Sequence, residues 1–296
     1  MVNRLYDQIF GRNAGRDAPF LILPDGRRIS HGAFLARAAR FAGAIAGLGV
    51  RPGDRVAVQI DKSPDALAVY AGCALSGVVF LPLNTAYTPA ELGYFVENAG
   101  AALFLCTPGK TEALAPVAAR AGARLATLGT DGDGTLAEAA DAAPDDFPPV
   151  PCGEDDLAAL LYTSGTTGRS KGAMMSHRNL VSNARALADL WRFTDRDVLL
   201  HALPIYHTHG LFVATNIVAL TGGAMIFLPK LDIDALIGWM PQATSLMGVP
   251  TFYTRLLEDP RFDRALAAHM RLFVSGSAPL LAETHRQFEA RTGHRI

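Results

Sequence analysis

Residues 157–175 read LAALLYTSGTTGRSKGAMM. The apolar run Leu157 to Leu161 is typical of a buried strand, and a second short apolar run, Gly172 to Met175, follows the polar segment. From Tyr162 to Gly172 there are five Ser or Thr residues, three glycines and two cations. Glycines let the backbone approach a ligand closely, while hydroxyls and amides donate hydrogen bonds. The stretch therefore predicts a strand–loop–strand unit that binds a polyphosphate.

Two familiar phosphate motifs do not describe this loop. From Gly165 the P-loop pattern G-x-x-x-x-G-K-[ST] almost fits, since Lys171 stands at the correct offset. However, Ser170 takes the place of the second glycine, and Gly172 takes the place of the Ser or Thr that binds magnesium. The dinucleotide pattern G-x-G-x-x-G is also absent from the loop. A plain surface turn is the alternative, but two cations directly after a buried strand favour a phosphate site.

Strand and helix patterns alternate on both sides of the loop. Strands are expected at Pro19 to Leu23, Arg27 to Ile29, Arg55 to Ile60, Val78 to Pro82, Leu103 to Cys106, Val198 to Ala202, Ala224 to Leu228, Thr244 to Met247 and Arg271 to Val274. Helices are expected at Leu5 to Phe10, Ala33 to Leu48, Ser63 to Ser76, from Thr88 onward, Ser176 to Phe193, Leu211 to Leu220, Asp232 to Gln242 and Ala282 to Arg291. This alternation predicts an α/β fold with layered, mostly parallel sheets flanked by helices.

The composition changes between Asp131 and Asp156, where Ala, Pro, Gly and acidic residues dominate. We interpret this segment as a linker or excursion. It predicts a first α/β subdomain over residues 1–150 and a second one over residues 151–296 that contains the phosphate loop.

Composition also limits the partners. The chain has 296 residues and a net charge of -1, which gives no indication of a nucleic-acid or anionic-membrane partner. Residues 202–229 carry no charge, but Pro, His and Gly interrupt them, so a buried helix and strand are favoured over a membrane span. Three widely spaced cysteines and the absence of an apolar signal core predict a cytoplasmic protein.

The string YTSGTTGRSKGAMMSH, residues 162–177, resembles the phosphate loop of the AMP-forming acyl-CoA synthetases, and within that superfamily most closely the malonyl-CoA synthetases. The usual family loop has Pro where this chain has Ser170. The resemblance covers essentially the whole chain and implies the large N-terminal domain of such an enzyme. Pro82 to Ala99 also resembles a family segment, for which we expect a packing role.

The resemblance implies that ATP, Mg²⁺ and coenzyme A take part in the reaction. The residues expected to hold the nucleotide phosphates are Thr163, Ser164, Gly165, Thr166, Thr167 and Gly168. Lys171 and Arg169 are expected to offset the charge of the departing pyrophosphate. Thr163 is also expected to approach the metal ion.

The segment LPIYHTHG, residues 203–210, places two histidines in an uncharged setting. Two histidines on an irregular turn are compatible with a metal site, but no third ligand is near in sequence, and a buried histidine is commonly a packing residue. The resemblance implies instead that His207 lines the path between ATP and the acyl group. His209 is then expected to influence specificity.

A small-residue turn follows the last predicted strand, at the end where open α/β sheets bind ligands. The resemblance places it beside the adenine and the acyl pocket, and its residues are Ser275, Gly276, Ser277, Ala278 and Pro279.

Arg255 has two interpretations. It can form a surface ion pair with Glu258, three residues on, or its planar guanidinium can bind the second carboxylate of a dicarboxylic acid. Arg271 and Arg286 are weaker candidates for the same task.

The resemblance implies an ATP-dependent ligase that forms malonyl-CoA from malonate through an acyl-adenylate, with release of AMP and pyrophosphate. The alternatives are a ligase for another short-chain or aromatic carboxylic acid, or a nucleotide-binding fragment without catalysis. The family's later nucleotide contacts and its small C-terminal domain with a catalytic Lys have no counterpart in these 296 residues. We therefore expect a fragment that is inactive in isolation.

Overall fold

The computed structural model describes residues 2–163 and 170–296, and its chain forms two compact units. The first unit comprises Met1–Gly15 and Gly32–Asn183, and the second comprises Arg16–His31 and Ala184–Ile296. This division differs from the predicted boundary at residue 150. The reason is strand pairing, because Ala159 lies in register with Phe80 and so joins the first sheet.

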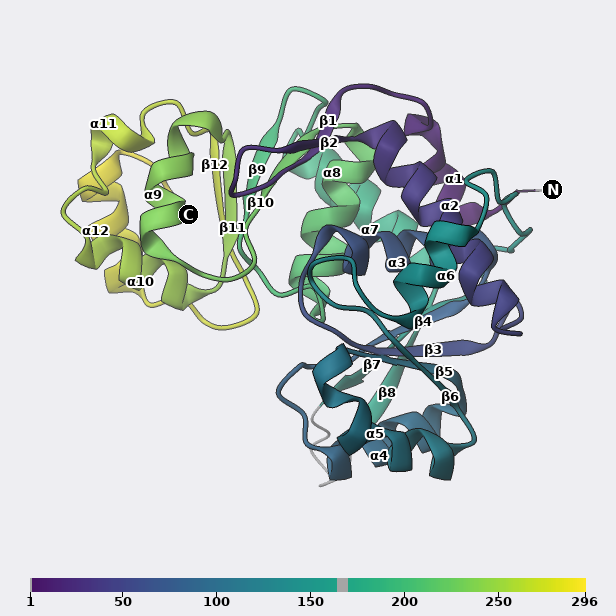
Figure 1. Cartoon of the computed structure of the whole chain (residues 1–296). Helices are drawn as coiled ribbons and strands as arrows, with labels where there is room; N and C mark the ends of the chain where they lie inside the picture. The colour runs from purple at the N-terminus through teal and green to yellow at the C-terminus, as the bar shows by residue number, and fades with distance from the viewer. Residues whose placement is uncertain (1, 164–169) are drawn as a thin grey trace. The chain divides into compact units, whose positions relative to one another are not determined.

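The first unit contains a six-stranded sheet in the order β6-β5-β3-β4-β7-β8. Neighbouring strands are parallel except β7 and β8. The strands are β3 Arg55–Gln59, β4 Val79–Pro82, β5 Ala101–Cys106, β6 Arg124–Thr127, β7 Leu157–Thr163 and β8 Lys171–Ser176. The α-helices are α1 Arg4–Ile9, α2 His31–Gly47, α3 Pro64–Ser76, α4 Pro89–Ala99, α5 Thr111–Ala121 and α6 Thr135–Ala142. Figure 1 shows α4 and α5 on one face of this sheet and α3 and α6 on the other.

The second unit contains another six-stranded sheet, in the order β12-β11-β9-β10-β1-β2. Only the β1–β2 hairpin is antiparallel. The strands are β1 Pro19–Ile22, β2 Arg28–Ser30, β9 Val198–His201, β10 Ala224–Phe227, β11 Ser245–Gly248 and β12 Leu272–Ser275. The helices are α7 His177–Leu190, which begins in the first unit, the π-helix His209–Thr215, α8 Asn216–Thr221, α9 Ile233–Trp239, α10 Pro250–Glu258, α11 Arg264–Ala267 and α12 Ala282–Thr292. The predicted layered α/β fold is confirmed.

Local sequence signals explain how α4 begins. The Thr88 side chain accepts a hydrogen bond from the Glu91 amide, and the Glu91 carboxylate accepts one from the Thr88 amide, which makes a reciprocal capping box. Pro89 occupies the first helical position, where its missing N–H costs nothing. The helix start predicted at Thr88 is therefore confirmed.

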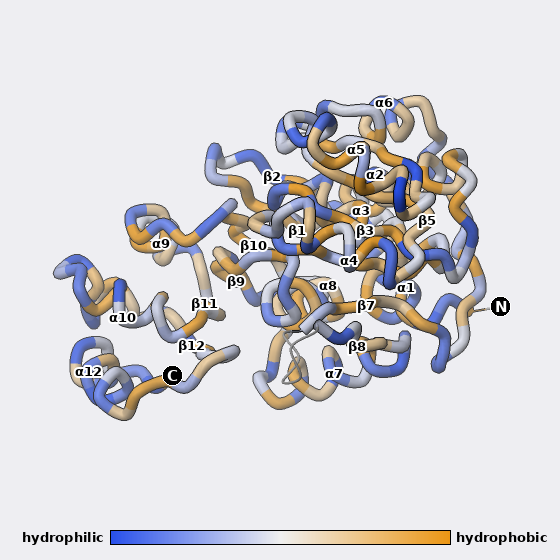
Figure 2. The backbone as a smooth tube through the Cα atoms, turned by 90° about the horizontal axis from the view of Figure 1, so that it is seen from below, coloured by the Kyte–Doolittle hydropathy of each residue, from blue (hydrophilic) through white to orange (hydrophobic). Residues whose placement is uncertain are grey.

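The first unit has an apolar core between its sheet and the α4–α5 layer. Leu81, Leu92, Val96 and Phe104 are fully buried there. Figure 2 shows hydrophobic colour along β7 and hydrophilic colour at many connecting loops. Burial of such side chains contributes about 1.5–3 kcal/mol each, which is the main stabilisation of the unit.

The segment 131–156, predicted as a linker or excursion between two subdomains, lies within the first unit. The segment contains α6. After α6 the chain packs on other parts of the same unit, because the Val150 amide donates to the Leu75 carbonyl and Cys152 forms an isolated parallel β-bridge with Asn3. The physical reason is that α6 buries Leu136 and Ala140. The proline-rich composition of this segment thus corresponds to an irregular path within one unit and not to a boundary between two units.

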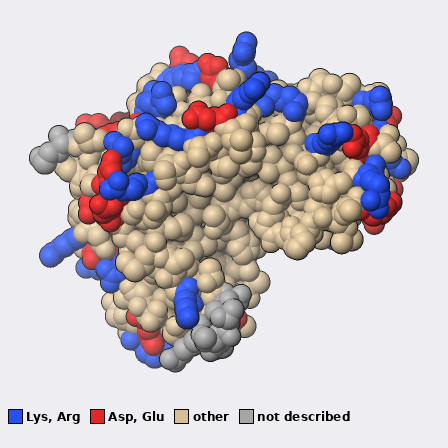
Figure 3. All heavy atoms as spheres, turned by 180° about the vertical axis from the view of Figure 1, so that it is seen from behind, with Lys and Arg blue, Asp and Glu red and all other residues tan. Residues whose placement is uncertain are grey.

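The uncharged residues 202–229 form the π-helix, α8 and β10, as expected for buried elements. No helix in the described part of the chain is long and apolar enough to cross a bilayer. On the face drawn in Figure 3, basic and acidic side chains lie beside one another, in keeping with the near-zero net charge.

Candidate functional site

The first candidate site lies in the first unit, where β7 ends and β8 begins. The two strands are antiparallel, and Thr163 lies directly opposite Lys171. Both side chains are exposed. Paired positions in an antiparallel ladder place their side chains on the same face, so the Thr163 hydroxyl and the Lys171 ammonium lie at one mouth of the hairpin. The strand–loop–strand prediction is confirmed for these flanks, while Ser164, Gly165, Thr166, Thr167, Gly168 and Arg169 lie outside the described residues.

Helix α4 contacts both flanks of this segment. On the β7 side, the hydroxyl of buried Tyr162 donates to Asn98 Oδ1 at 2.6 Å, and the Tyr162 ring lies 4.6 Å from that of Phe95. On the β8 side, the Tyr94 hydroxyl donates to the Ser170 carbonyl at 2.9 Å. Burial, with a smaller contribution from Tyr94, raises the pKa of Tyr162 to about 12, so that its hydroxyl stays neutral and donates.

A second candidate site belongs to the second unit and follows β9. His207 lies in the connection to the π-helix, and its ring contacts that of Tyr206 at a centroid distance of 4.6 Å. Partial desolvation lowers the pKa of His207, and burial lowers that of His209. Both imidazoles are therefore neutral near pH 7, and each has a nitrogen lone pair that can accept a hydrogen bond.

His209 meets the small-residue turn that follows β12. Its Nδ1 lies 3.4 Å from the Ser277 hydroxyl, and a Cβ added to Gly276 would stand 3.1 Å from its Cε1. A side chain at position 276 would therefore press against the His209 imidazole. Ser277 adopts a φ of +69°, a left-handed conformation that costs a non-glycine residue about 1–3 kcal/mol and is concentrated at functional sites.

The rest of that turn also has features of a ligand site. In the described part of the chain, the buried Ser275 hydroxyl has no hydrogen-bond partner. Ala278 and Pro279 follow and are exposed. The structure therefore brings together two candidate segments that lie far apart in the sequence, the histidine segment and the turn after β12.

His201 is a residue of this region that the sequence analysis missed. It ends β9, and its buried Nε2 lies 2.8 Å from the Gly210 carbonyl, which also accepts a hydrogen bond from the Thr215 hydroxyl. A Cβ on Gly210 would stand 2.1 Å from the Pro204 carbonyl oxygen, so only glycine fits. His201 thereby fixes the start of the π-helix that carries His209, and no local pattern distinguishes it from an ordinary strand residue.

The three candidate arginines differ in their surroundings. Arg271 is bound to Asp197, and Arg286 is bound to Glu283. Arg255 is exposed on α10, and in the residues that the structure describes it makes no ion pair with Glu258. The structure therefore gives no support to the ion-pair interpretation of Arg255. The carboxylate-binding interpretation stays a prediction.

Over residues 2–163 and 170–296, no group of three or more His, Cys, Asp or Glu side chains is arranged to hold a metal ion. Magnesium in nucleotide sites commonly takes few protein ligands and completes its shell with water and phosphate oxygens. The exposed Thr163 hydroxyl is a donor of the required type.

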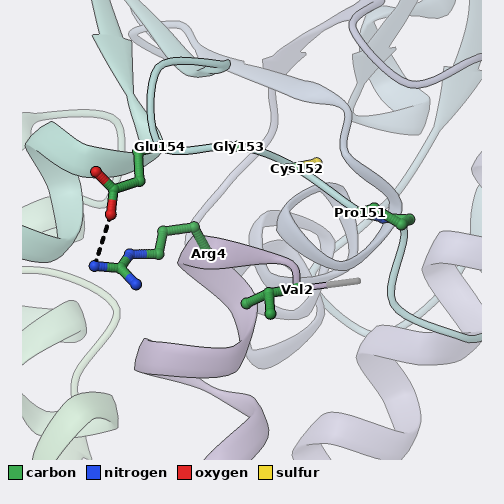
Figure 4. A pocket seen from close by; sticks show the side chains of 6 residues that line it. All are labelled: Val2, Arg4, Pro151, Cys152, Gly153 and Glu154. Atoms are coloured by element: carbon green, nitrogen blue, oxygen red, sulfur yellow. Dashed lines mark ion pairs between the residues drawn. The ribbon is translucent and has the colours of Figure 1, made fainter.

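A cavity of about 380 Å³ lies elsewhere in the first unit, beside the N-terminal residues (Figure 4). Arg4 and Glu154 form an ion pair of 2.8 Å at its wall. Among the predicted site residues that the structure describes, none lines this cavity.

The chain belongs to the AMP-binding enzyme family, whose sequence profile matches residues 10–296. The strands of both sheets, the Thr163–Lys171 mouth and the turn at Ser275 all lie within that range.

Individual relatives differ in the acid that their names specify. A feruloyl-CoA synthase from Amycolatopsis sp is 34% identical over 261 residues, which cover 87% of this chain and 51% of that protein. A malonate–CoA ligase from Arabidopsis thaliana is 32% identical over 274 residues, which cover 84% of this chain and 45% of that protein. The crystal structure of ATP-bound MatB from Rhodopseudomonas palustris is 52% identical, with a TM-score of 0.97 over all of this chain and 59% of MatB. The chain thus spans about half the length of the curated relatives it matches.

Proposed function

We propose that the full-length protein is an AMP-forming acid–thiol ligase that converts malonate, ATP and coenzyme A into malonyl-CoA, AMP and pyrophosphate. The observation that carries the proposal is the β7–β8 mouth, where a hydroxyl and an ammonium from facing strand positions flank a Gly-, Ser- and Thr-rich loop of the AMP-binding family. The similarity to a malonate–CoA ligase supports malonate as the acid, and the 52% identity to ATP-bound MatB supports ATP as a substrate.

In the first half-reaction a malonate carboxylate oxygen attacks the α-phosphorus of ATP. The bond from that phosphorus to the bridging oxygen breaks, and pyrophosphate leaves. Lys171 offsets negative charge on the departing pyrophosphate, and the Thr163 hydroxyl donates a hydrogen bond to a phosphate oxygen. Positioning and charge stabilisation of this kind dominate such reactions. Bound Mg²⁺ would supply further neutralisation of the phosphate charge, and Thr163 is the described residue suited to hold it.

The neutral imidazole of His207 orients the attacking carboxylate through a hydrogen bond, and His209 with Ser277 borders the acyl group. In the second half-reaction the thiol of coenzyme A attacks the acyl carbonyl, and AMP leaves with the electron pair of the broken C–O bond. No protein nucleophile takes part. The three cysteines are free and buried, which agrees with a reducing compartment such as the cytoplasm.

Malonate has a second carboxylate, and Arg255 is our candidate to bind it. Its guanidinium is exposed and presents a planar fork that matches two carboxylate oxygens. We expect Arg255→Ala to raise the KM for malonate about tenfold or more, with a smaller effect on kcat. Arg286→Ala, which removes a surface partner of Glu283 on α12, is the matched control. An unchanged KM for malonate in Arg255→Ala would remove Arg255 from this role.

The substrate is tested by ATP–pyrophosphate exchange in the full-length protein. Exchange that depends on malonate, and is weaker with ferulate, acetate or long-chain acids, is the expected result. Exchange with ferulate and none with malonate would replace the acid by an aromatic one, an alternative that the similarity to a feruloyl-CoA synthase supports.

A second candidate for the 296-residue chain itself is a nucleotide-binding fragment without catalysis. The chain covers 59% of MatB, which supports this option. Calorimetry with Mg-ATP on the isolated chain, followed by an exchange assay, separates binding from turnover.

A further inference from the structure

Helix α4 lies far from the phosphate loop in sequence, yet its side chains reach both flanks of it. Tyr94 and Asn98 stand one helical turn apart on α4 and therefore point to the same side. Before the loop, the Asn98 side chain accepts a hydrogen bond from the Tyr162 hydroxyl. After the loop, the Tyr94 hydroxyl donates a hydrogen bond to the Ser170 carbonyl. We infer that Tyr94 is a positioning residue for the triphosphate of ATP. This inference rests on the proposed function and deepens it.

The β8 side of the hairpin depends on this contact. Within residues 2–163 and 170–296, β8 is the last strand in the sheet order and pairs with β7 alone. Its Ala173 and Met174 are exposed, so within the described residues packing holds this end weakly. A strand with one partner frays more readily than a central strand, and Lys171 is the first residue of β8. The Tyr94 bond to Ser170 fixes the backbone immediately before Lys171.

An aromatic cluster holds Tyr94 in place for this contact. Its ring lies 5.6 Å from that of Phe95 and 6.0 Å from that of Tyr162. Phe95 in turn contacts the Tyr162 ring, so the same cluster supports both flanks. A ring held on two sides presents its hydroxyl in one direction, which gives the hydrogen bond to Ser170 its geometric precision.

The contact also explains why Ser is compatible with position 170, where the family loop usually has Pro. Tyr94 binds the carbonyl oxygen of residue 170, and Pro and Ser both supply a carbonyl. The side chain at that position is therefore free to vary while the anchor is kept.

Tyr94→Phe removes the hydroxyl and keeps the ring. In the full-length protein we expect the Kd for Mg-ATP to rise about fivefold, the effect of one lost neutral hydrogen bond, while the Kd for AMP stays unchanged. AMP lacks the β- and γ-phosphates that the loop holds, so a general folding defect would weaken both ligands whereas loss of loop positioning weakens ATP alone. Without nucleotide, amide hydrogen exchange in the peptide covering residues 170–176 should accelerate.

Tyr87→Phe is the matched control. It removes a hydroxyl from the same aromatic cluster, since the Tyr87 ring lies 4.9 Å from that of Phe95, and it should change neither the ATP affinity nor exchange in residues 170–176. Tyr162→Phe, at the other flank, should reproduce the selective loss of ATP affinity.

An unchanged Kd for ATP in Tyr94→Phe, or an equal loss for ATP and AMP, overturns the inference. The proposed function is tested by a separate outcome. If the wild-type protein shows no carboxylate-dependent exchange of pyrophosphate but the selective loss of ATP affinity is found, the ligase proposal falls and the role of Tyr94 stands.

Discussion

The Arg271 Nε lies 2.5 Å from Oδ1 of Asp197, a carboxylate that is only 4% exposed. Burial alone would raise the pKa of Asp197, but hydrogen bonds from Arg271, the Thr194 amide and the Thr244 hydroxyl outweigh it and lower that pKa. The carboxylate thus joins β12 to the starts of β9 and β11. Arg271 is a structural residue of the second unit and is not available to bind a substrate.

The first prediction concerns this buried charge. We expect Asp197→Ala to lower the free energy of unfolding by about 2–4 kcal/mol, because it removes the acceptor of four hydrogen bonds, from the Thr194 amide and hydroxyl, the Thr244 hydroxyl and the Arg271 guanidinium. Urea denaturation measures the change. Asp195→Ala, which breaks the exposed pair with Arg16, should cost less than about 1 kcal/mol. Equal effects of the two substitutions would contradict the assignment.

The second prediction tests the close approach at Gly210. Gly210→Ala would place a methyl group 2.1 Å from the Pro204 carbonyl oxygen, which forces the backbone that carries His207 and His209 to move. We expect a loss of several kcal/mol in stability, about 3 or more, and loss of exchange activity in the full-length protein.

Its control is Gly238→Ala on α9, where no atom lies within 4 Å of the added Cβ. This change should stabilise the protein by about 0.5–1 kcal/mol, because alanine favours a helix more than glycine does. Thermal unfolding of both variants shows whether the loss at Gly210 is specific to the crowded site.

The third prediction is a pH dependence centred on His177. Its buried Nδ1 accepts a hydrogen bond of 3.0 Å from the Leu5 amide, and burial lowers its pKa, with the Asp156 charge acting in the opposite direction. The unfolded state then binds a proton more readily than the folded state, so stability falls as the pH drops below about 6.5.

His177→Asn keeps an acceptor for the Leu5 amide but removes the titrating group. Urea midpoints at pH 7.5 and 5.5 should differ less in this variant than in the wild type. His285→Asn, at an exposed position on α12, serves as the control and should retain the wild-type difference. A wild-type slope that persists in His177→Asn would assign the effect to other groups.

The fourth prediction compares two Thr-Pro pairs. Thr88 precedes Pro89 and caps α4 with its side chain, whereas Thr107 precedes Pro108 and its side chain makes no capping bond. Thr88→Ala should therefore cost about 1 kcal/mol in the free energy of unfolding, and Thr107→Ala only a few tenths. If both cost the same, the capping box does not stabilise α4.

Much of the fold was predictable from local signals. The apolar run after the loop, the Thr88 cap and the buried character of residues 202–229 each gave the correct element, because patterning and caps act over a few residues. The position of the unit boundary was not predictable in this way. It depends on β7 pairing with β4 and on β1 pairing with β10, and such partners are decided by the whole sheet.

The candidate site residues also divide into those that the sequence indicated and those that it did not. His209 and the turn at Ser277 were selected by resemblance, and the structure shows that they meet. Tyr94 and His201 act through hydrogen bonds to backbone carbonyls, at Ser170 and Gly210. A carbonyl accepts a bond whatever its side chain is, so the acceptor position carries no sequence signature and these contacts had no local signal.

The hairpin β1–β2 has a consequence for how the protein is made. Leu21 pairs with Met225, so a segment near the start of the chain completes a sheet whose other strands are synthesised much later. During translation the first hairpin has no partner until β10 leaves the ribosome, and its apolar face, including buried Phe20 and Leu21, stays unprotected in the meantime. Residues 184–296 expressed alone would leave the β10 edge open to association with other chains, whereas the same residues joined to residues 16–31 would close it.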